Sequence, residues 1–309
     1  MTHATPRELL TRYSLAAKKS WGQNFLVDER VYASIVAACA LEEDDVVLEI
    51  GAGLGTLTAR LLDSGAQVYA VERDDDMCQV LQAELGQRSN FHLLAENALT
   101  LDLARVPPPS KDPARGITAV GNLPYHIASP LIFRLLAERQ RLRRLVVMVQ
   151  REVAERMLAQ VGDDDYSSMS VNIQFVAAAR RICRVGPQSF LPAPRVQSMV
   201  VMLEPRAQPL YPVQSLTRFN ATVRAAFGQR RKTLRNALST VFGAAALPAL
   251  QAAAIDPQRR GETLTLAEFA RLSDQLPEPS EVQAAQQAAK LSEDGAAAQT
   301  EAAAGEADA

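Results

Sequence analysis

The segment Asn122-Leu123-Pro124-Tyr125 places an amide, a backbone carbonyl and an aromatic ring just after a short apolar run, 117–120. Pro124 has no N–H to donate and therefore ends strand pairing. The Asn122 side-chain oxygen and the Leu123 carbonyl are two acceptors for one amino group, and Tyr125 offers a flat face for stacking. This set suits an aromatic amine such as the N6 group of adenine. The alternative interpretation is a proline-terminated strand in which Asn122 only caps a helix.

An exocyclic amine is a poor nucleophile because its lone pair is delocalised into the ring. If both of its N–H bonds point at Asn122 and Leu123, the nitrogen becomes more tetrahedral and its lone pair is aimed at an electrophile. A sulfonium methyl group is such an electrophile, and its transfer requires alignment more than a strong base. We therefore expect no His-Asp or Cys-His pair beside this segment, and interpret His126 as a helix-start residue.

A glycine-rich loop with Gly51, Gly53 and Gly55 follows the apolar run 46–51, and Glu72 ends the next run. Glycines let the backbone approach a ligand closely, and a carboxylate at the second strand end can accept both hydroxyls of a ribose. Together they predict a nucleoside-bearing cofactor, either a dinucleotide or S-adenosylmethionine. Thr56 stands where a dinucleotide fingerprint has a third glycine, which favours S-adenosylmethionine. The alternative is a tight turn and a solvated acid.

The elements that must position these residues alternate along the chain. Apolar runs that predict strands are separated by helical patterns, and these runs are 46–51, 67–72, 91–96, 117–122 and 144–150. Such alternation predicts an α/β fold with a parallel sheet covered by helices on both faces. Two later runs, 171–185 and 198–203, are expected to add a hairpin-like edge to the sheet. From about residue 207 the pattern is helical, which predicts a second, smaller all-α domain.

Composition excludes several classes of protein. The 309 residues are 48% hydrophobic and 22% charged, an ordinary globular composition, and no run approaches the roughly 18 apolar residues of a membrane helix. The N-terminus lacks the apolar core of a secretory signal. The three cysteines, Cys39, Cys78 and Cys183, are scattered and not at metal-binding spacing, so we expect reduced thiols, no metal site and a cytoplasmic protein.

The net charge of −2 conceals an asymmetry. Residues 276–309 contain seven acidic residues and one lysine, a net charge of −6, so residues 1–275 carry +4. The terminal stretch is rich in Ala, Gln and Glu and has no aromatic residue, which predicts a disordered acidic tail. The mildly basic body is compatible with a polyanionic partner.

Seven segments of the chain form one joint pattern: KKSWGQNFLVDERV (18–31), LEIGAGLGTLT, VERD, VGNLPYHIASPL, MVQREVAERM, FLPAPRVQSMVV (190–201) and AFGQRRKTLRNAL (226–238). By this pattern the chain resembles, over about residues 18–275, the bacterial ribosomal RNA adenine N6,N6-dimethyltransferases that act on small-subunit 16S RNA.

This resemblance implies a Rossmann-like class I S-adenosylmethionine-dependent methyltransferase sheet with a small all-α C-terminal domain. The expected division is an N-terminal extension (1–17), the Rossmann-like domain (18–206), a helical RNA-binding domain (207–275) and the acidic tail (276–309).

The resemblance also implies the residues of the site. The cofactor-binding positions that it implies are Asn24, Leu26, Gly51, Glu72, Asn97 and Asn122. Asn97 stands where the family usually has an Asp that accepts a hydrogen bond from the adenine amine of the cofactor. An Asn oxygen can still accept such a bond, so we expect binding to survive with altered affinity. Glu96 could take this role instead.

The catalytic residues implied by the resemblance are Asn122, Leu123 and Tyr125, with Tyr125 stacking on the target base. Phe190 is expected to form the second aromatic wall of the base pocket; the alternative is a core Phe before a proline turn.

Two groups of cations are candidates for contact with RNA. The first lies in the helical domain and comprises Arg224, Arg230, Arg231, Lys232 and Arg235. These cations cross a predicted helix start, where the helix dipole disfavours positive charge, so we interpret them as phosphate contacts. The second group is Arg139, Arg141, Arg143 and Arg144. For either group the alternative is a solvated surface.

The predicted function is therefore S-adenosylmethionine-dependent dimethylation of adenine N6 in small-subunit ribosomal RNA, by a monomer that needs no metal and no membrane. The resemblance implies two adjacent adenines in the 3′-terminal hairpin of 16S rRNA, and immature 30S subunits as partner. One alternative is a 23S rRNA adenine N6-methyltransferase of the antibiotic-resistance type. Another is a ribosome-assembly factor whose binding role outweighs catalysis. A nicotinamide-dependent oxidoreductase is disfavoured by Thr56.

Overall fold

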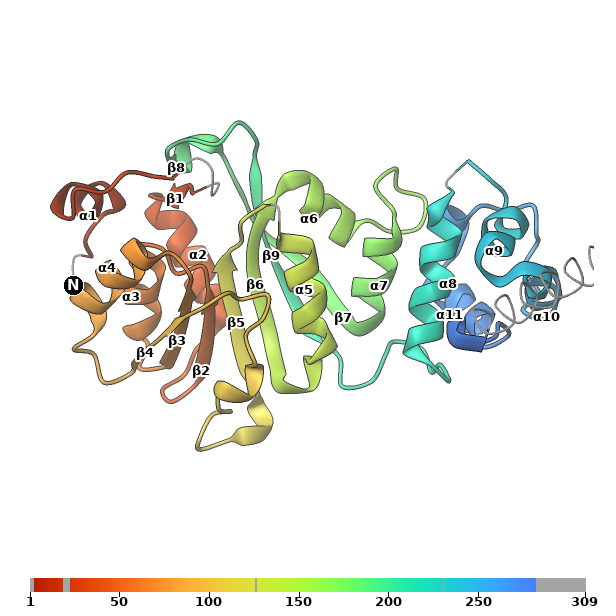
Figure 1. Cartoon of the computed structure of the whole chain (residues 1–309), viewed down its shortest axis with the longest axis horizontal. Helices are drawn as coiled ribbons and strands as arrows, with labels where there is room; N and C mark the ends of the chain where they lie inside the picture. The colour runs from red at the N-terminus through yellow and green to blue at the C-terminus, as the bar shows by residue number, and fades with distance from the viewer. Residues whose placement is uncertain (1–2, 19–22, 126, 230, 282–309) are drawn as a thin grey trace, which may run out of the picture. The chain divides into compact units, whose positions relative to one another are not determined.

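The computed structural model describes residues 3–18, 23–125, 127–229 and 231–281. Its described residues form two compact units (Figure 1). Of the described residues, the larger unit contains those up to 159 together with 173–210, and the smaller unit contains 160–172 and those between 211 and 281. The division expected from the sequence, at 206/207, remains a prediction.

The larger unit is built on a mixed sheet of seven described strands in the order β4-β3-β2-β5-β6-β9-β7. Their bounds are β2 Val46–Ile50, β3 Gln67–Glu72, β4 Phe91–Ala95, β5 Ile117–Asn122, β6 Leu142–Gln150, β7 Ala177–Val185 and β9 Ser198–Pro205. Strands β2 to β6 pair in parallel, whereas β9 pairs antiparallel with both β6 and β7. Strand β2 is buried along its whole length, as expected for a central parallel strand.

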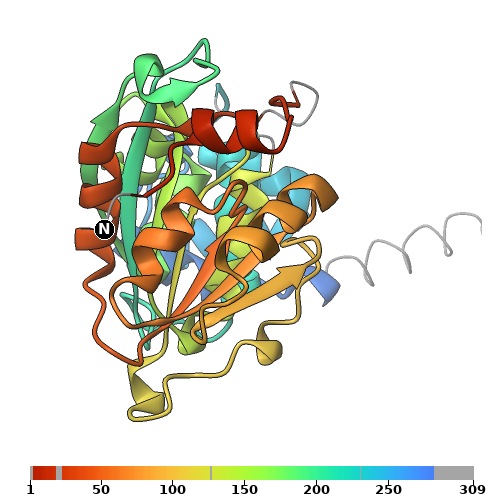
Figure 2. The same cartoon turned by 90° about the vertical axis from the view of Figure 1, so that its left-hand side faces the viewer.

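Helices cover both faces of this sheet (Figure 2). Helices α2 (Glu29–Cys39), α3 (Thr56–Leu62) and α4 (Asp75–Leu85) contribute apolar side chains to one core cluster with β2, β3 and β6. The β2-α3-β3 and β5-α5-β6 crossovers leave the sheet centre in opposite directions. Because such crossovers are right-handed, α5 (Ala128–Ala137) lies on the opposite face from α3. Helix α6 (Arg151–Leu158) packs on β6, β7 and β9. The predicted α/β fold class is confirmed.

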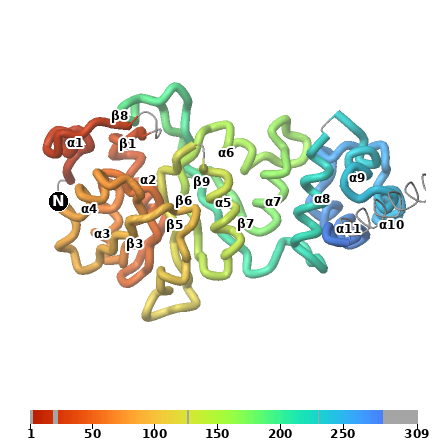
Figure 3. Tube along the Cα trace, in the orientation of Figure 1, coloured from red at the N-terminus to blue at the C-terminus, as the bar shows by residue number. Residues whose placement is uncertain are grey.

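Two N-terminal elements complete the larger unit. Helix α1 (Pro6–Arg12) begins at a capping box formed by Thr5 and Glu8, and its Leu9 is buried in a cluster with residues of the glycine loop and α4. Strand β1 (Phe25–Leu26) pairs antiparallel with β8 (Phe190–Leu191), so two segments far apart in sequence lie side by side (Figure 3).

The apolar run 171–185 is not a single strand. Its first part belongs to helix α7 (Ser168–Val176), and β7 begins at Ala177. Alternating burial at Val171, Ile173 and Phe175 resembles that of a strand, and a short apolar run does not by periodicity distinguish a strand from a buried helix. The expected hairpin-like edge is nevertheless present, because β7 and β9 pair antiparallel.

The smaller unit is helical, as expected. Its α-helices are α8 (Leu216–Gly228), α9 (Leu234–Phe242), α10 (Ala246–Ala252) and α11 (Leu266–Ser273). Its core is apolar, and the Tyr166 hydroxyl donates a 3.0 Å hydrogen bond to the Leu264 carbonyl. Short 3-10 helices in the two units are η2 (Leu103–Arg105), η3 (Pro113–Arg115), η4 (Arg139–Arg141), η5 (Pro187–Ser189), η6 (Gly243–Ala245) and η7 (Gly261–Thr263). Within the described residues, no helix combines the length and apolarity that crossing a membrane requires.

Candidate active site

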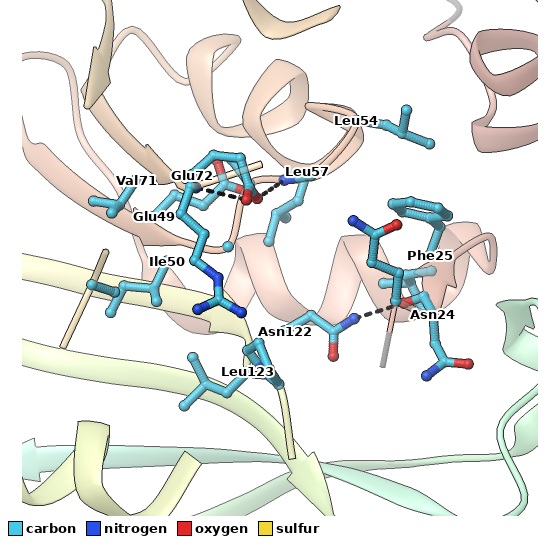
Figure 4. A pocket seen from close by; sticks show the side chains of 18 of the residues that line it. Asn24, Phe25, Glu49, Ile50, Leu54, Leu57, Val71, Glu72, Asn122 and Leu123 are labelled. Atoms are coloured by element: carbon cyan, nitrogen blue, oxygen red, sulfur yellow. Dashed lines mark hydrogen bonds between the residues drawn. The ribbon is translucent and has the colours of Figure 1, made fainter. Parts of the chain in front are cut away.

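One pocket gathers the motifs at the carboxyl edge of the parallel strands. Because β2, β3 and β5 run in parallel and in register, their ends at Ile50, Glu72 and Asn122 meet at the same edge of the sheet. The pocket there is lined by the segment 23–26, the glycine loop, the ends of β3 and β4, and the residues 122–125. Figure 4 shows Glu49, Glu72, Asn24 and Asn122 around this pocket.

The three glycines of the loop all use their N–H groups for hydrogen bonds within the protein. Gly51, Gly53 and Gly55 have φ values of 71°, 56° and 77°, a left-handed region that L side chains rarely adopt. The N–H groups of Gly51 and Ala52 donate to the Val71 carbonyl, that of Gly53 to Glu72 and that of Gly55 to Ala52. A pyrophosphate cradle needs free N–H groups, so this loop favours S-adenosylmethionine over a dinucleotide.

The Glu72 carboxylate is held by three backbone donors. Its Oε2 accepts from Gly53 N at 2.9 Å, and its Oε1 accepts from the N–H groups of Arg73 and Asp74 at 2.8 and 2.9 Å. Because a carboxylate has about four acceptor positions, the fixed Glu72 side chain can still accept from a hydroxyl in the pocket. This geometry is compatible with its predicted role at a ribose.

Glu49 is a pocket residue that our sequence analysis missed. It is the penultimate residue of β2 and lines the pocket although only 2% of it is exposed. Burial raises its pKa to about 8, and the nearby Glu72 charge acts in the same direction. No described residue forms a hydrogen bond with its Oε2 atom. The signal in the sequence was a glutamate inside the otherwise apolar strand VVLEI. Burying an acidic side chain costs free energy unless it is paired or neutralised, so an acid at such a position indicates a specific role.

Asn122 is oriented by the N-terminal segment. Its Nδ2 donates to the Asn24 carbonyl oxygen at 3.1 Å, and the reversed amide would place two oxygens against each other. The Asn122 oxygen therefore lies on the side of the amide away from Asn24 (Figure 4). The Leu123 N–H donates to Met148 O at 3.1 Å, which fixes the turn as the chain leaves β5.

Of the two expected aromatic walls, only Tyr125 lines the pocket among the described residues. Its hydroxyl shares a 3.0 Å hydrogen bond with the buried Ser198 Oγ, which restricts the ring. Phe190 is 4% exposed, belongs to the core cluster and lies opposite Leu26 in the β1–β8 pair. Phe25, the neighbour of Leu26, lines the pocket instead. The role of Phe190 at the base stays a prediction.

Asn97 and Glu96 both line the pocket, but each already has a protein partner. The Asn97 Oδ1 accepts the Leu99 N–H at 3.0 Å, which leaves one lone pair on that oxygen for a ligand. Glu96 forms an ion pair with Arg105. The described geometry therefore leaves Asn97 the better placed of the two for the predicted contact.

The cations expected to contact RNA belong to the smaller unit. Arg224 lies on α8, Arg231 and Lys232 lie in the turn before α9, and Arg235 lies on α9. All four are exposed, and none of them forms an ion pair with another residue that the structure describes. Arg230 lies outside the described residues, as does His126.

Three arginines of the second group bind other groups of the protein. Arg143 forms an ion pair with Asp45 at 3.0 Å and donates to the Ala40 carbonyl. Arg144 donates to Ala38 O at 2.7 Å. Both side chains thus bind carbonyl groups at the C-terminal end of α2, which that helix leaves without partners. Arg141 likewise donates to carbonyls of the chain near η2, so these three arginines are engaged by the protein itself.

Among the described residues there is no cluster of three or more His, Cys, Asp or Glu side chains able to hold a metal ion. The three cysteines form no disulfide, and Cys39 is buried. The expectation of a metal-free site stays a prediction.

The family described as ribosomal RNA adenine dimethylase matches residues 14–278. The chain belongs to this family. It is 48% identical over 282 residues to the ribosomal RNA small subunit methyltransferase A of Anaeromyxobacter sp. (strain K), covering 89% of this chain and 98% of that protein. It is 39% identical over 270 residues to the protein of the same name from Clostridium botulinum, covering 87% of this chain and 97% of the relative.

Solved structures agree with this assignment. A dimethyladenosine transferase from Plasmodium falciparum has a TM-score of 0.68 at 27% identity, covering 80% of this chain and 95% of that one. The 23S rRNA methyltransferase ErmE has a TM-score of 0.62 at 26% identity, covering 82% and 99%. The rRNA adenine dimethylase is thus an S-adenosylmethionine-dependent methyltransferase of the Rossmann-like class with ribosomal RNA as its substrate class, as the sequence motifs predicted.

The residues of the pocket fit S-adenosylmethionine. The fixed Glu72 carboxylate suits the two hydroxyls of a ribose, and the buried Glu49 Oε2, which has no hydrogen-bond partner among the described residues, can pair with a polar group of a bound ligand. Among the described residues that line the pocket, the one cation is Arg73, which is exposed. When bound, S-adenosylmethionine supplies an electrophilic methyl group on its sulfonium.

Proposed function

We propose that this enzyme transfers two methyl groups to N6 of each of two adjacent adenines in the 3′-terminal hairpin of 16S rRNA, acting as a cytoplasmic monomer on immature 30S subunits. The observation that carries the catalytic part is the orientation of Asn122. Its amide is tied to Asn24 through Nδ2, so its oxygen is available as an acceptor beside the glycine loop.

In this proposal the residues of the enzyme align the target amine with the methyl donor and do not remove a proton from it beforehand. In the first transfer, the Asn122 oxygen and the Leu123 carbonyl accept the two N–H bonds of the adenine amine, which directs the nitrogen lone pair toward the methyl donor. In the second transfer, the monomethylated amine has one N–H left, and one of these two acceptors receives it. Tyr125, restrained by Ser198, stacks on the base and holds it in the pocket. The transferred methyl leaves the nitrogen cationic, so its proton becomes acidic and is lost to solvent without a dedicated base.

The choice of the small subunit rests on relatedness. The relatives named as small-subunit enzymes are 39–48% identical over most of the chain, whereas the 23S enzyme is 26% identical. The exposed cations at the α8–α9 turn support a phosphate-rich partner, and the target adenine would be unpaired or extruded to reach the pocket.

The experiment that tests this function uses purified enzyme, methyl-labelled S-adenosylmethionine and three substrates: unmethylated 30S subunits, 50S subunits and free 16S rRNA. We expect label in 16S rRNA of 30S subunits, mapped to two adjacent adenines near the 3′ end. Label confined to 50S subunits would contradict the assignment and favour the 23S alternative. Tight 30S binding without any label would favour the assembly-factor alternative.

The residue that the mechanism depends on can be tested separately. Asn122→Ala should abolish detectable methyl transfer while cofactor affinity, measured by calorimetry, stays within about tenfold of wild type, or about 1.4 kcal/mol. Asn236→Ala, an exposed position on α9, is a control that should keep full activity. Full activity of Asn122→Ala would contradict the proposed mechanism.

A further inference from the structure

Asp74 lies at the centre of a hydrogen-bond network that joins the two halves of the pocket. It caps the N-terminus of α4, is 1% exposed and follows Glu72 by two residues. Its Oδ2 accepts from Gln23 Nε2 at 2.7 Å, and its Oδ1 accepts from Lys18 Nζ at 2.6 Å. A cap needs only one of these oxygens, and Oδ1 also accepts the Asp76 N–H at 3.2 Å. The second oxygen is thus committed to Gln23.

The Gln23 side chain is fixed at both of its ends. Its Nε2 donates to Asp74, and its Oε1 accepts the backbone N–H of Lys18 at 2.9 Å. Because both contacts are made, the amide cannot rotate without losing two hydrogen bonds. The backbone that follows Gln23 is therefore held in place.

Asn24, the residue after Gln23, connects this fixed backbone to Asn122 on the other side of the pocket. The Asn24 carbonyl accepts from Asn122 Nδ2 at 3.1 Å. A continuous path consequently runs from the end of β3, through Asp74, Gln23 and Asn24, to the Asn122 amide at the end of β5. Both ends of this path line the cofactor pocket, at Glu72 and Asn122.

We infer that Asp74 is a positioning residue for methyl transfer: through the Gln23 amide it sets the Asn24 carbonyl, and the carbonyl sets the orientation of the Asn122 side chain. This inference rests on the proposed function, because it takes Asn122 as the residue that aligns the target amine. It assigns to a helix cap a role that capping alone does not require.

In the hydrogen bond between positions 23 and 74, Gln23 is the donor and Asp74 is the acceptor, and substitutions can exchange these two roles. In Asp74→Asn the cap is retained, since Asn is as good a capping residue as Asp, but an NH₂ group then faces the Gln23 NH₂. In Gln23→Glu two carboxylates face each other. In the double variant, the new amide at position 74 donates to one oxygen of the new carboxylate at position 23, and the Lys18 N–H donates to the other oxygen. Both contacts are thereby restored, the one between positions 74 and 23 with reversed polarity.

The test compares wild type, both single variants and the double variant by single-turnover methylation of unmethylated 30S subunits at saturating S-adenosylmethionine. We expect each single variant to lose at least tenfold in rate at saturation, and the double variant to return to within threefold of wild type. Thermal midpoints serve as a second readout, because a purely structural role would lower the midpoint and leave the saturated rate of the folded enzyme unchanged. Asp102→Asn, which alters the cap of η2, is the matched control and should keep its rate.

Three outcomes would overturn the inference. Wild type that methylates no ribosomal RNA contradicts the proposed function and this inference with it. Active wild type with single variants that keep their saturated rate contradicts the inference alone. Single variants that lose activity without recovery in the double variant show that Asp74 does not act through the Gln23 amide.

Discussion

Glu49 illustrates how one residue links the pocket to the stability of the protein. Its folded-state pKa of about 8 is above the ordinary carboxyl value because burial disfavours the charged form. The folded protein therefore holds a proton that the unfolded chain releases. The contribution of Glu49 to stability is fully present below the unfolded pKa and is lost as the pH rises through about 8.

We predict that Glu49→Gln removes this pH dependence. Between about pH 5 and pH 8 the free energy of unfolding of wild type should fall, relative to Glu49→Gln, by about 1.4 kcal/mol per pH unit at the steepest. Urea denaturation in a pH series measures the difference. Glu43→Gln removes an exposed carboxylate and should run parallel to wild type. Parallel profiles of wild type and Glu49→Gln would show that Glu49 is ionised throughout this range.

Asn97 offers a second prediction at a single residue. In Asn97→Asp the side chain can keep its bond from the Leu99 N–H and presents a charged acceptor to the pocket. Hydrogen bonds to charged groups are stronger than neutral ones by roughly 1 kcal/mol, so we expect the Kd for S-adenosylmethionine to fall by about fivefold. Calorimetry measures this, and an unchanged Kd would place Asn97 outside the contact with the cofactor. Asn236→Asp, at an exposed position of α9, controls for added charge.

Single residues also show what sequence reasoning can and cannot supply. Glu72 and Asn122 were placed at one pocket because parallel strands end at a common edge, a rule that needs no side-chain detail. The contacts of Phe25 and Phe190 could not be placed, because they depend on the pairing of two-residue strands about 165 positions apart in the chain. Neither local propensity nor periodicity reports such a pairing.

Among the elements, helix α1 shows that the N-terminal extension is part of the site's support. Leu9 is 3% exposed and packs with Leu54, Met77 and Val80. Leu54 belongs to the glycine loop and lines the pocket. Arg12 and Tyr13 both bond Glu84 on α4 at 2.7 Å, which anchors the end of the helix. The position of the loop thus depends on the docking of α1.

We predict that Leu9→Ala lowers the free energy of unfolding by about 2–3 kcal/mol, because it removes a buried side chain from a small cluster. The Kd for S-adenosylmethionine should rise by roughly fivefold, about 1 kcal/mol, as Leu54 loses its support. Urea denaturation and calorimetry check the two effects. Arg7→Ala, exposed on the same helix, should change stability by less than about 0.5 kcal/mol. Unchanged cofactor affinity in Leu9→Ala would show that α1 stabilises the fold only.

The order and type of the elements were largely predictable, because long periodic segments and continuous apolar strands carry strong signals. What failed was local. Residues 171–176 alternate like a strand but form the end of α7. The cations of β6 resemble a free charge run, but Arg143 and Arg144 bind the carbonyl end of α2. Only the packed sheet brings that helix end within their reach.

At the scale of the whole molecule, charge is unevenly distributed along the chain. The acidic stretch 276–309 carries −6, so the remaining 275 residues carry +4. Within the smaller unit, Arg231 and Lys232 are exposed and without an ion pair among the described residues. If these two cations contact phosphates, each neutralised phosphate releases counterions, and RNA binding falls as salt rises.

We predict that the double variant Arg231→Glu, Lys232→Glu weakens binding to 30S subunits at least tenfold and reduces the slope of log K against log salt by about 2, one for each lost phosphate contact. Filter binding over a range of KCl concentrations measures both quantities. Arg7→Glu, Arg30→Glu changes the net charge equally at two exposed positions of the larger unit, and its slope should match wild type. A local phosphate contact at the α8–α9 turn requires that only the first double variant loses slope. If both double variants lose slope equally, RNA binding responds to the net charge of the protein and not to this contact.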